Sequence, residues 1–92
     1  MIVRISGEDQ YRLQESSGGR LNELDDDVHA AVQSGDEQRF RDAYRRLLEF
    51  VRSTGSVVGE EEIETSDVIL PPADISLAEA SAEFTGEGLI PD

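Results

Sequence analysis

The sequence contains no cysteine and no lysine, and it has a single histidine. The lack of cysteine excludes disulfide bonds, thiolate nucleophiles and zinc sites built on cysteine. The lack of lysine excludes Schiff-base chemistry and lysine nucleophiles. No apolar run approaches membrane-spanning length, and the first residues lack the pattern of a secretory signal. We therefore expect a cytoplasmic protein that is not an enzyme.

Basic residues are scarce and unevenly placed along the chain. Eight arginines stand against 21 acidic residues, which gives a net charge of −13 at pH 7. All eight arginines lie within residues 1–52, whereas residues 53–92 hold ten acids and no base. Affinity for nucleic acid rests on clustered cations, so this distribution argues against nucleic acid as a direct partner. A partner with a basic protein surface fits this acidic second half better.

Residues 36–53 form the clearest predicted element, an amphipathic helix. Its apolar residues recur at helical spacing and are Phe40, Ala43, Tyr44, Leu47, Leu48, Phe50 and Val51. They cover an arc of roughly 160°, wider than the minimal stripe of a core-facing helix, so this helix must pack on a large apolar surface. Leu47 lies at the centre of the arc, and we expect it to be fully buried.

The residues before this helix predict a β-hairpin and a further helix. Apolar and polar residues alternate over residues 1–14 on both sides of a turn at Gly7, which is typical of a hairpin. Residues 17–34 predict an amphipathic helix with Ser17 as its N-cap. Because only a short turn separates it from the helix at 36–53, the two helices must fold back as an antiparallel helical hairpin.

The second half of the chain predicts fewer regular elements. Residues 56–66 are acidic and show little periodicity, so we expect an exposed loop. Residues 67–70 contain a short apolar run stopped by two prolines, consistent with a buried strand that joins the hairpin. Ser76 and Glu79 have the spacing of a capping box at the start of a short helix.

These elements predict one small α+β domain over residues 1–92. Its sheet has three strands, two from the hairpin and one near residues 67–70, and it packs against the helical hairpin. A short C-terminal helix and a tail complete residues 67–92. A chain of this size buries only about 60 to 65% of its unfolded surface, and self-repulsion opposes compaction. We therefore expect marginal stability that salt increases.

One group of residues has the types found in metal sites: Asp25, Asp26 and Asp27 followed by His29. Consecutive helical positions point 100° apart, so only Asp25 and His29 can share an ion. Two ligands are too few, and the spacing is not that of a calcium loop. We expect a solvated helix face with a modest Asp25–His29 pair, and we predict no catalytic residue, metal site or cofactor.

Two groups of charged residues are candidate sites for a partner. The acidic group is the run Glu60, Glu61 and Glu62. The basic group clusters on one edge of the predicted helix at 36–53 and consists of Arg41, Arg45 and Arg52. These arginines have the chemistry to meet an acidic partner or lipid headgroups, but the net charge opposes docking on an anionic membrane. A solvated, ion-paired face is the simpler interpretation of the basic group.

Five short stretches carry a resemblance that covers essentially the whole chain. They are residues 1–5, Gly7 with residues 10–12, residues 21–25, residues 67–74 and residues 88–91. In combination they resemble the phage-shock-protein-A-associated family. The resemblance implies a non-enzymatic accessory of the envelope-stress response that binds phage shock protein A, a coiled-coil membrane-remodelling protein. It also implies recruitment to the inner face of the membrane only through this partner.

The charge asymmetry supports an alternative hypothesis from another class. A chain whose last 40 residues contain ten acids and no base suits an acidic mimic, which occupies a nucleic-acid-binding or other basic surface of another protein. The two hypotheses differ in the partner that the protein captures from a native lysate.

Overall fold

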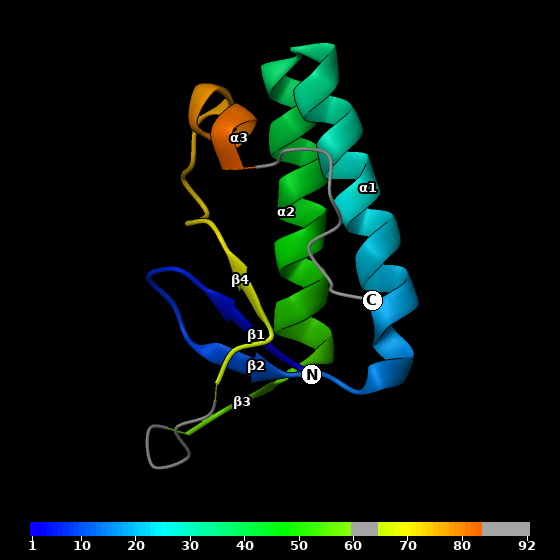
Figure 1. Ribbon diagram of the computed structural model, residues 1–92, viewed down its shortest axis with the longest axis vertical. Coiled ribbons are helices and arrows are strands. Elements are labelled where there is room, and N and C mark those ends of the chain that lie inside the picture. The colour runs from blue at the N-terminus through cyan, green and yellow to red at the C-terminus, as the bar shows by residue number, and fades with distance from the viewer. Residues whose placement is uncertain (60–64, 84–92) are drawn as a thin grey trace.

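A four-stranded sheet packs against a pair of antiparallel helices in the computed structural model, which describes residues 1–59 and 65–83 (Figure 1). The strands are β1 (Ile2–Ile5), β2 (Gln10–Arg12), β3 (Ser56–Val57) and β4 (Val68–Leu70). The helices are a 3-10 turn (Glu15–Ser17), α1 (Gly18–Ser34), α2 (Glu37–Thr54) and α3 (Leu77–Glu83). The predicted α+β class, helical hairpin and short C-terminal helix are confirmed.

The sheet is mixed and has the strand order β3-β2-β1-β4. β1 pairs antiparallel with β2 and parallel with β4, so Val3 lies opposite both Tyr11 and Val68. β3 adds an antiparallel edge strand to β2. The predicted count of three strands is therefore wrong by one.

The additional strand comes from residues that were predicted to lie in the acidic loop. Residues 56–57 carry no periodic pattern because two residues are too few to show one. Their pairing is decided by the chain reversal at Gly55, which lays them along β2, where the Val58 amide donates to the Gln10 carbonyl at 2.9 Å. Glu60, Glu61 and Glu62 lie outside the described residues.

The start of α1 differs from the predicted capped start. Ser17 stands at the predicted N-cap position, but it has helical backbone angles and its side chain makes no capping hydrogen bond. Instead the 3-10 turn runs directly into α1, with the Ser17 amide donating to the Gln14 carbonyl at 3.0 Å. α1 ends at Gly35, whose φ of 71° lies in the left-handed region that glycine adopts without strain.

α2 lies across the helix-covered face of the sheet and provides much of the core. Its N-cap is Asp36, whose carboxylate accepts the Arg39 amide at 3.1 Å. Leu47 has no exposed surface, as predicted from the centre of the apolar arc. The core also contains Val3 and Ile5 of β1 and Leu21 of α1, so α2 contacts both the sheet and α1.

The segment after β4 returns over α2 and leads into α3. The predicted capping box is present, because the Glu79 amide donates to the Ser76 hydroxyl at 3.2 Å and the Ser76 amide donates to the Glu79 carboxylate at 3.4 Å. Ala80 of α3 is fully buried against the core. The predicted tail beyond residue 83 lies outside the described residues.

Candidate functional site

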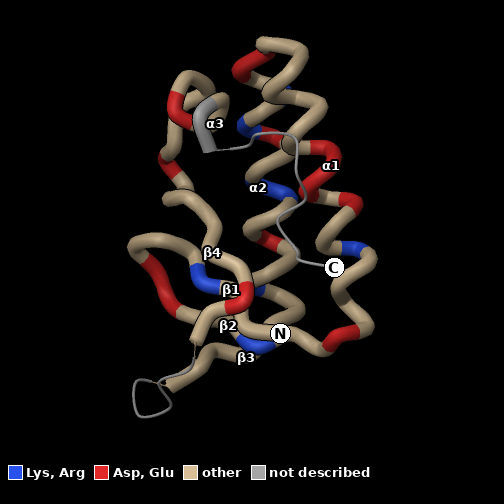
Figure 2. The backbone as a smooth tube through the Cα atoms, in the orientation of Figure 1, with Lys and Arg blue, Asp and Glu red and all other residues tan. Residues whose placement is uncertain are grey.

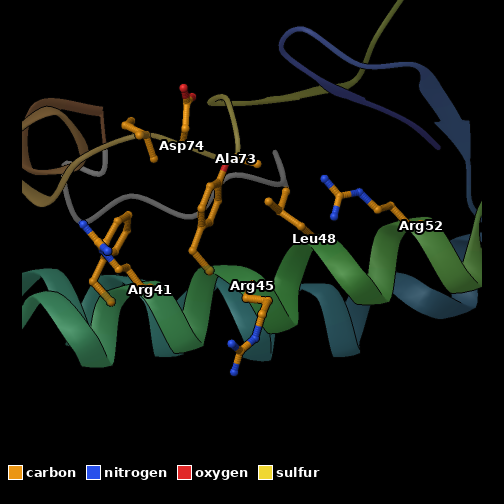
Figure 3. Close-up of a pocket in the computed structure, with 9 residues that line it drawn as sticks. Arg41, Arg45, Leu48, Arg52, Ala73 and Asp74 are labelled. Atoms are coloured by element: carbon orange, nitrogen blue, oxygen red, sulfur yellow. The ribbon is translucent and has the colours of Figure 1, made fainter.

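A groove of about 410 Å³ runs along α2, opposite the segment that joins β4 to α3 (Figure 3). α2 contributes Phe40, Arg41, Tyr44, Arg45, Leu48 and Arg52. The second wall is formed by Ala73, Asp74 and Ile75. The groove therefore contains all three arginines that the sequence singled out.

Apolar side chains of α2 fill the floor of the groove. The rings of Phe40 and Tyr44 stack with centroids 5.7 Å apart and an interplanar angle of 11°. Phe40, Tyr44 and Leu48 are each no more than 3% exposed. Because these side chains leave so little surface open, the floor offers no deep apolar pocket, and the accessible polar groups of the groove lie at its rim.

A hydrogen bond from the core positions the second wall. The Tyr44 hydroxyl donates to the carbonyl of Pro71, and both residues are buried. This bond joins residues 27 positions apart and holds the chain after β4 against α2. The Ile75 amide then donates to the Pro72 carbonyl at 3.1 Å, which closes the turn that presents Asp74.

Arg41 and Arg45 form the exposed part of the rim. Arg41 pairs with Glu37 at 2.7 Å and Arg45 with Asp42 at 3.3 Å, both within α2. The arginine side chains are 65% and 64% exposed. Pairs this exposed contribute little to stability and exchange readily for other carboxylates. In Figure 3 the Arg45 side chain extends away from Asp74, so its guanidinium faces outward.

Arg52 is held more firmly than the other two arginines. Its Nε donates to one carboxylate oxygen of Glu8 at 3.0 Å and its Nη2 to the other at 2.5 Å. These hydrogen bonds raise the pKa of the Arg52 guanidinium above its usual value. The pair links residues 44 positions apart and ties the C-terminal end of α2 to the turn between β1 and β2.

α2 is net basic in a chain that is strongly acidic. It carries five arginines against three acids, whereas the whole chain has a net charge of −13. Figure 2 shows the basic segments of α2 beside the acidic segments of α1. The groove therefore lies on an element whose charge attracts carboxylates or other anions.

The Asp25–His29 pair on α1 is present but is not solvated as predicted. His29 Nε2 lies 3.3 Å from Asp25 Oδ1, and Asp25 is only 1% exposed. Helical periodicity placed Asp25 beside Leu21 and Leu24, yet the carboxylate suggested an exposed position. Burial was decided by what covers α1, which periodicity does not reveal.

The described residues provide neither a metal cluster nor a transmembrane span. Across residues 1–59 and 65–83, no three or more side chains of the ligand types His, Cys, Asp and Glu are placed to hold a metal ion. None of the helices in these ranges combines the length and apolar character needed to cross a bilayer. What the groove supplies is arginine side chains at an accessible rim, which bind anionic groups.

The sequence predicted the arginines of this groove but not its second wall. Helical spacing alone placed Arg41, Arg45 and Arg52 on one edge of the helix. The opposite wall at residues 73–75 had no sequence signal, because long-range contacts hold it, among them the Tyr44–Pro71 hydrogen bond and the packing of Ile75 in the core.

The fold and the groove define a small α+β protein with an arginine-rimmed groove along α2. The family model of the PspA-Associated proteins matches residues 1–92, the whole chain, and the chain belongs to this family. This membership confirms the resemblance seen in the sequence. Comparison with curated proteins and with solved structures gave no match.

Proposed function

We propose that the protein is a non-enzymatic accessory of the envelope-stress response that binds phage shock protein A and modulates its membrane-maintenance activity. The observation that carries this proposal is the family match over the whole chain, since the family is described by its association with PspA. The fold adds a candidate contact surface, the arginine-rimmed groove along α2. In this proposal the protein acts in the cytoplasm and reaches the membrane through its partner.

Charge supports two separate contributions to the encounter. Arg41 and Arg45 are exposed and exchangeable, so they suit direct contacts to carboxylates of the partner. The run Glu60, Glu61 and Glu62 suits long-range steering toward basic stretches of the partner, which acts on the association rate. Steering and contact therefore predict different kinetic effects for the two groups.

Two variants separate steering from contact. Replacing the acidic run by Glu60→Gln, Glu61→Gln and Glu62→Gln should lower the association rate with purified PspA and flatten its salt dependence. The matched control removes three exposed acids from α1 by Glu23→Gln, Asp26→Asn and Asp27→Asn. Surface-based binding kinetics at two salt concentrations measure the association rate of each variant with PspA. Equal effects of the two variants would show that net charge alone matters.

Modulation of PspA is tested genetically in a two-by-two comparison. Strains with and without this gene are compared in backgrounds that have or lack PspA, and membrane permeability is measured under envelope stress. The proposal expects the loss of this protein to change permeability only where PspA is present. A change of the same size in the background without PspA would refute an action through that partner.

The acidic-mimic hypothesis is kept because residues 53–92 contain ten acids and no base. It predicts that the tagged protein captures a nucleic-acid-binding protein from native lysate, whereas the favoured function predicts PspA. Nuclease treatment of the lysate excludes indirect capture through nucleic acid. The protein that dominates the captured material, and that also binds when both proteins are purified, decides between the two hypotheses.

A further inference from the structure

Arg41, Arg45 and Arg52 occupy positions of α2 that form a straight row. Their sequence offsets of zero, four and eleven place them within an arc of about 40° around the helix axis. With a rise of about 1.5 Å per residue, their Cα positions are spaced about 6 Å and then about 10.5 Å along the axis. All three line the same groove.

The filled floor of the groove limits what the row can recognise. Phe40, Tyr44 and Leu48 leave almost no open surface, so a partner cannot gain much by inserting an apolar anchor there. The rim, in contrast, is open at Arg41 and Arg45. The groups that this groove offers to a partner are therefore the guanidinium groups at its rim, which pair with carboxylates.

The spacing of the row distinguishes a helical partner segment from an extended one. In an extended strand, with about 3.3 Å per residue, the two intervals correspond to about two and three residues. The third carboxylate would then lie on the opposite face of the strand, because strand side chains alternate. A helix has the same rise as α2, so acids at offsets zero, four and eleven share one face and meet all three arginines.

From this geometry we infer that the groove binds an α-helical segment of a partner that carries carboxylates at offsets zero, four and eleven and lies alongside α2. Charge complementarity supports this occupant, since α2 holds five arginines against three acids. The pairs Arg41–Glu37 and Arg45–Asp42 are exposed, so partner carboxylates can replace Glu37 and Asp42. The bidentate bond to Glu8 fixes the Arg52 guanidinium at the end of the row, so a partner carboxylate there meets an arginine that is already paired, and Arg41 and Arg45 contribute most of the binding.

Designed peptides provide the direct test. One peptide is an alanine- and glutamine-based helix of about 20 residues, long enough to be helical in isolation, with glutamates at offsets zero, four and eleven. The second has the same composition, with glutamates at offsets zero, two and five, which spreads them around the helix. Each is titrated at low salt into the full-length protein, with NMR detection of the arginine side-chain signals. The aligned peptide should bind about fivefold more tightly, as one or two more weak charge pairs would give.

Two pairs of charge reversals on the same helix localise the effect. Arg41→Glu with Arg45→Glu should weaken binding of the aligned peptide about tenfold, the sum of two weak charge pairs. Arg39→Glu with Arg46→Glu changes the net charge equally but lies at a second groove, beside Asp27 and Asp36. This control should change the affinity by no more than about twofold. Dispersed amide spectra confirm that each variant is folded.

Several outcomes would overturn the inference. Equal binding of the two peptides would show that the offsets do not matter, and equal losses in the two arginine pairs would show that the effect is only net charge. Binding of the protein to anionic phospholipid vesicles that Arg41→Glu with Arg45→Glu abolishes, without discrimination between the peptides, would assign the row to lipid headgroups instead.

The inference rests on the proposed function for its natural partner, and the two can fail separately. If purified PspA binds both arginine-pair variants as tightly as the wild-type protein, the row is not its docking site, although the proposed function stands. If PspA does not bind the wild-type protein while the peptides are still discriminated, the row is a helix-binding surface and the proposed function is wrong.

Discussion

The Tyr44 hydroxyl donates a hydrogen bond to the Pro71 carbonyl from within the core, two residues before the segment that forms the second wall of the groove. It joins the middle of α2 to the residue that follows β4. The Tyr44 ring also stacks on Phe40, so the same side chain forms part of the floor and is hydrogen-bonded to the segment that leads into the second wall. Residues 73–75, which follow Pro71, form the wall of the groove opposite α2.

Tyr44→Phe should destabilise the protein by about 1–3 kcal/mol. The substitution keeps the aromatic ring but leaves a buried carbonyl without the hydroxyl donor, which costs roughly that much. Urea unfolding measures the change. Ser53→Ala is the matched control, because its exposed hydroxyl makes only a long hydrogen bond of 3.4 Å to Phe50. A Tyr44→Phe protein as stable as the control would show that the hydrogen bond contributes nothing.

Leu47→Ala should cost about 2–5 kcal/mol of stability, because Leu47 has no exposed surface and its truncation leaves a cavity. This is a large part of the about 5–15 kcal/mol expected for a whole domain. Thermal unfolding followed by circular dichroism provides the measurement. Arg46→Ala, at the adjacent exposed position of α2, should change the midpoint little. Similar midpoints for the two variants would contradict the packing of α2.

Gly55→Ala and Gly19→Ala should have opposite effects. A Cβ at Gly55 would lie 2.8 Å from the Val51 carbonyl oxygen and 2.9 Å from Tyr11 Cβ. These atoms cannot move aside easily, so Gly55→Ala should destabilise the protein by about 1–3 kcal/mol. A Cβ at Gly19 meets nothing within 4 Å, and alanine favours the helix there, so Gly19→Ala should stabilise by roughly 0.4–1 kcal/mol. Denaturant midpoints test both signs.

Sodium chloride should raise the melting temperature. The net charge of −13 produces self-repulsion in the folded state, and salt screens it over about 8 Å at physiological ionic strength. Calorimetry from low millimolar to 0.5 M salt gives the dependence, with a flat or falling midpoint as the contrary result. The Glu23→Gln, Asp26→Asn and Asp27→Asn variant has less charge, so salt should raise its melting temperature by less.

Local patterns determined several elements correctly. Gly7 has the positive φ of 80° that the hairpin turn requires, and Asp36, a residue type that favours the N-cap position, caps α2. The capping box of Ser76 and Glu79 is another local signal. Each depends on hydrogen bonds or backbone angles within a few residues, so the sequence contains the whole interaction.

The sequence by itself also determined which residues of α2 face the core and which form the arginine row, because a period of 3.6 residues fixes both. Only the tertiary structure decided the pairing of β3 with β2, the burial of Asp25 and the wall opposite the row. These features depend on contacts such as Tyr44 with Pro71 and Arg52 with Glu8, which join residues 27 and 44 positions apart. Such contacts form only once the core has brought distant segments together, so no local pattern in the sequence predicts them.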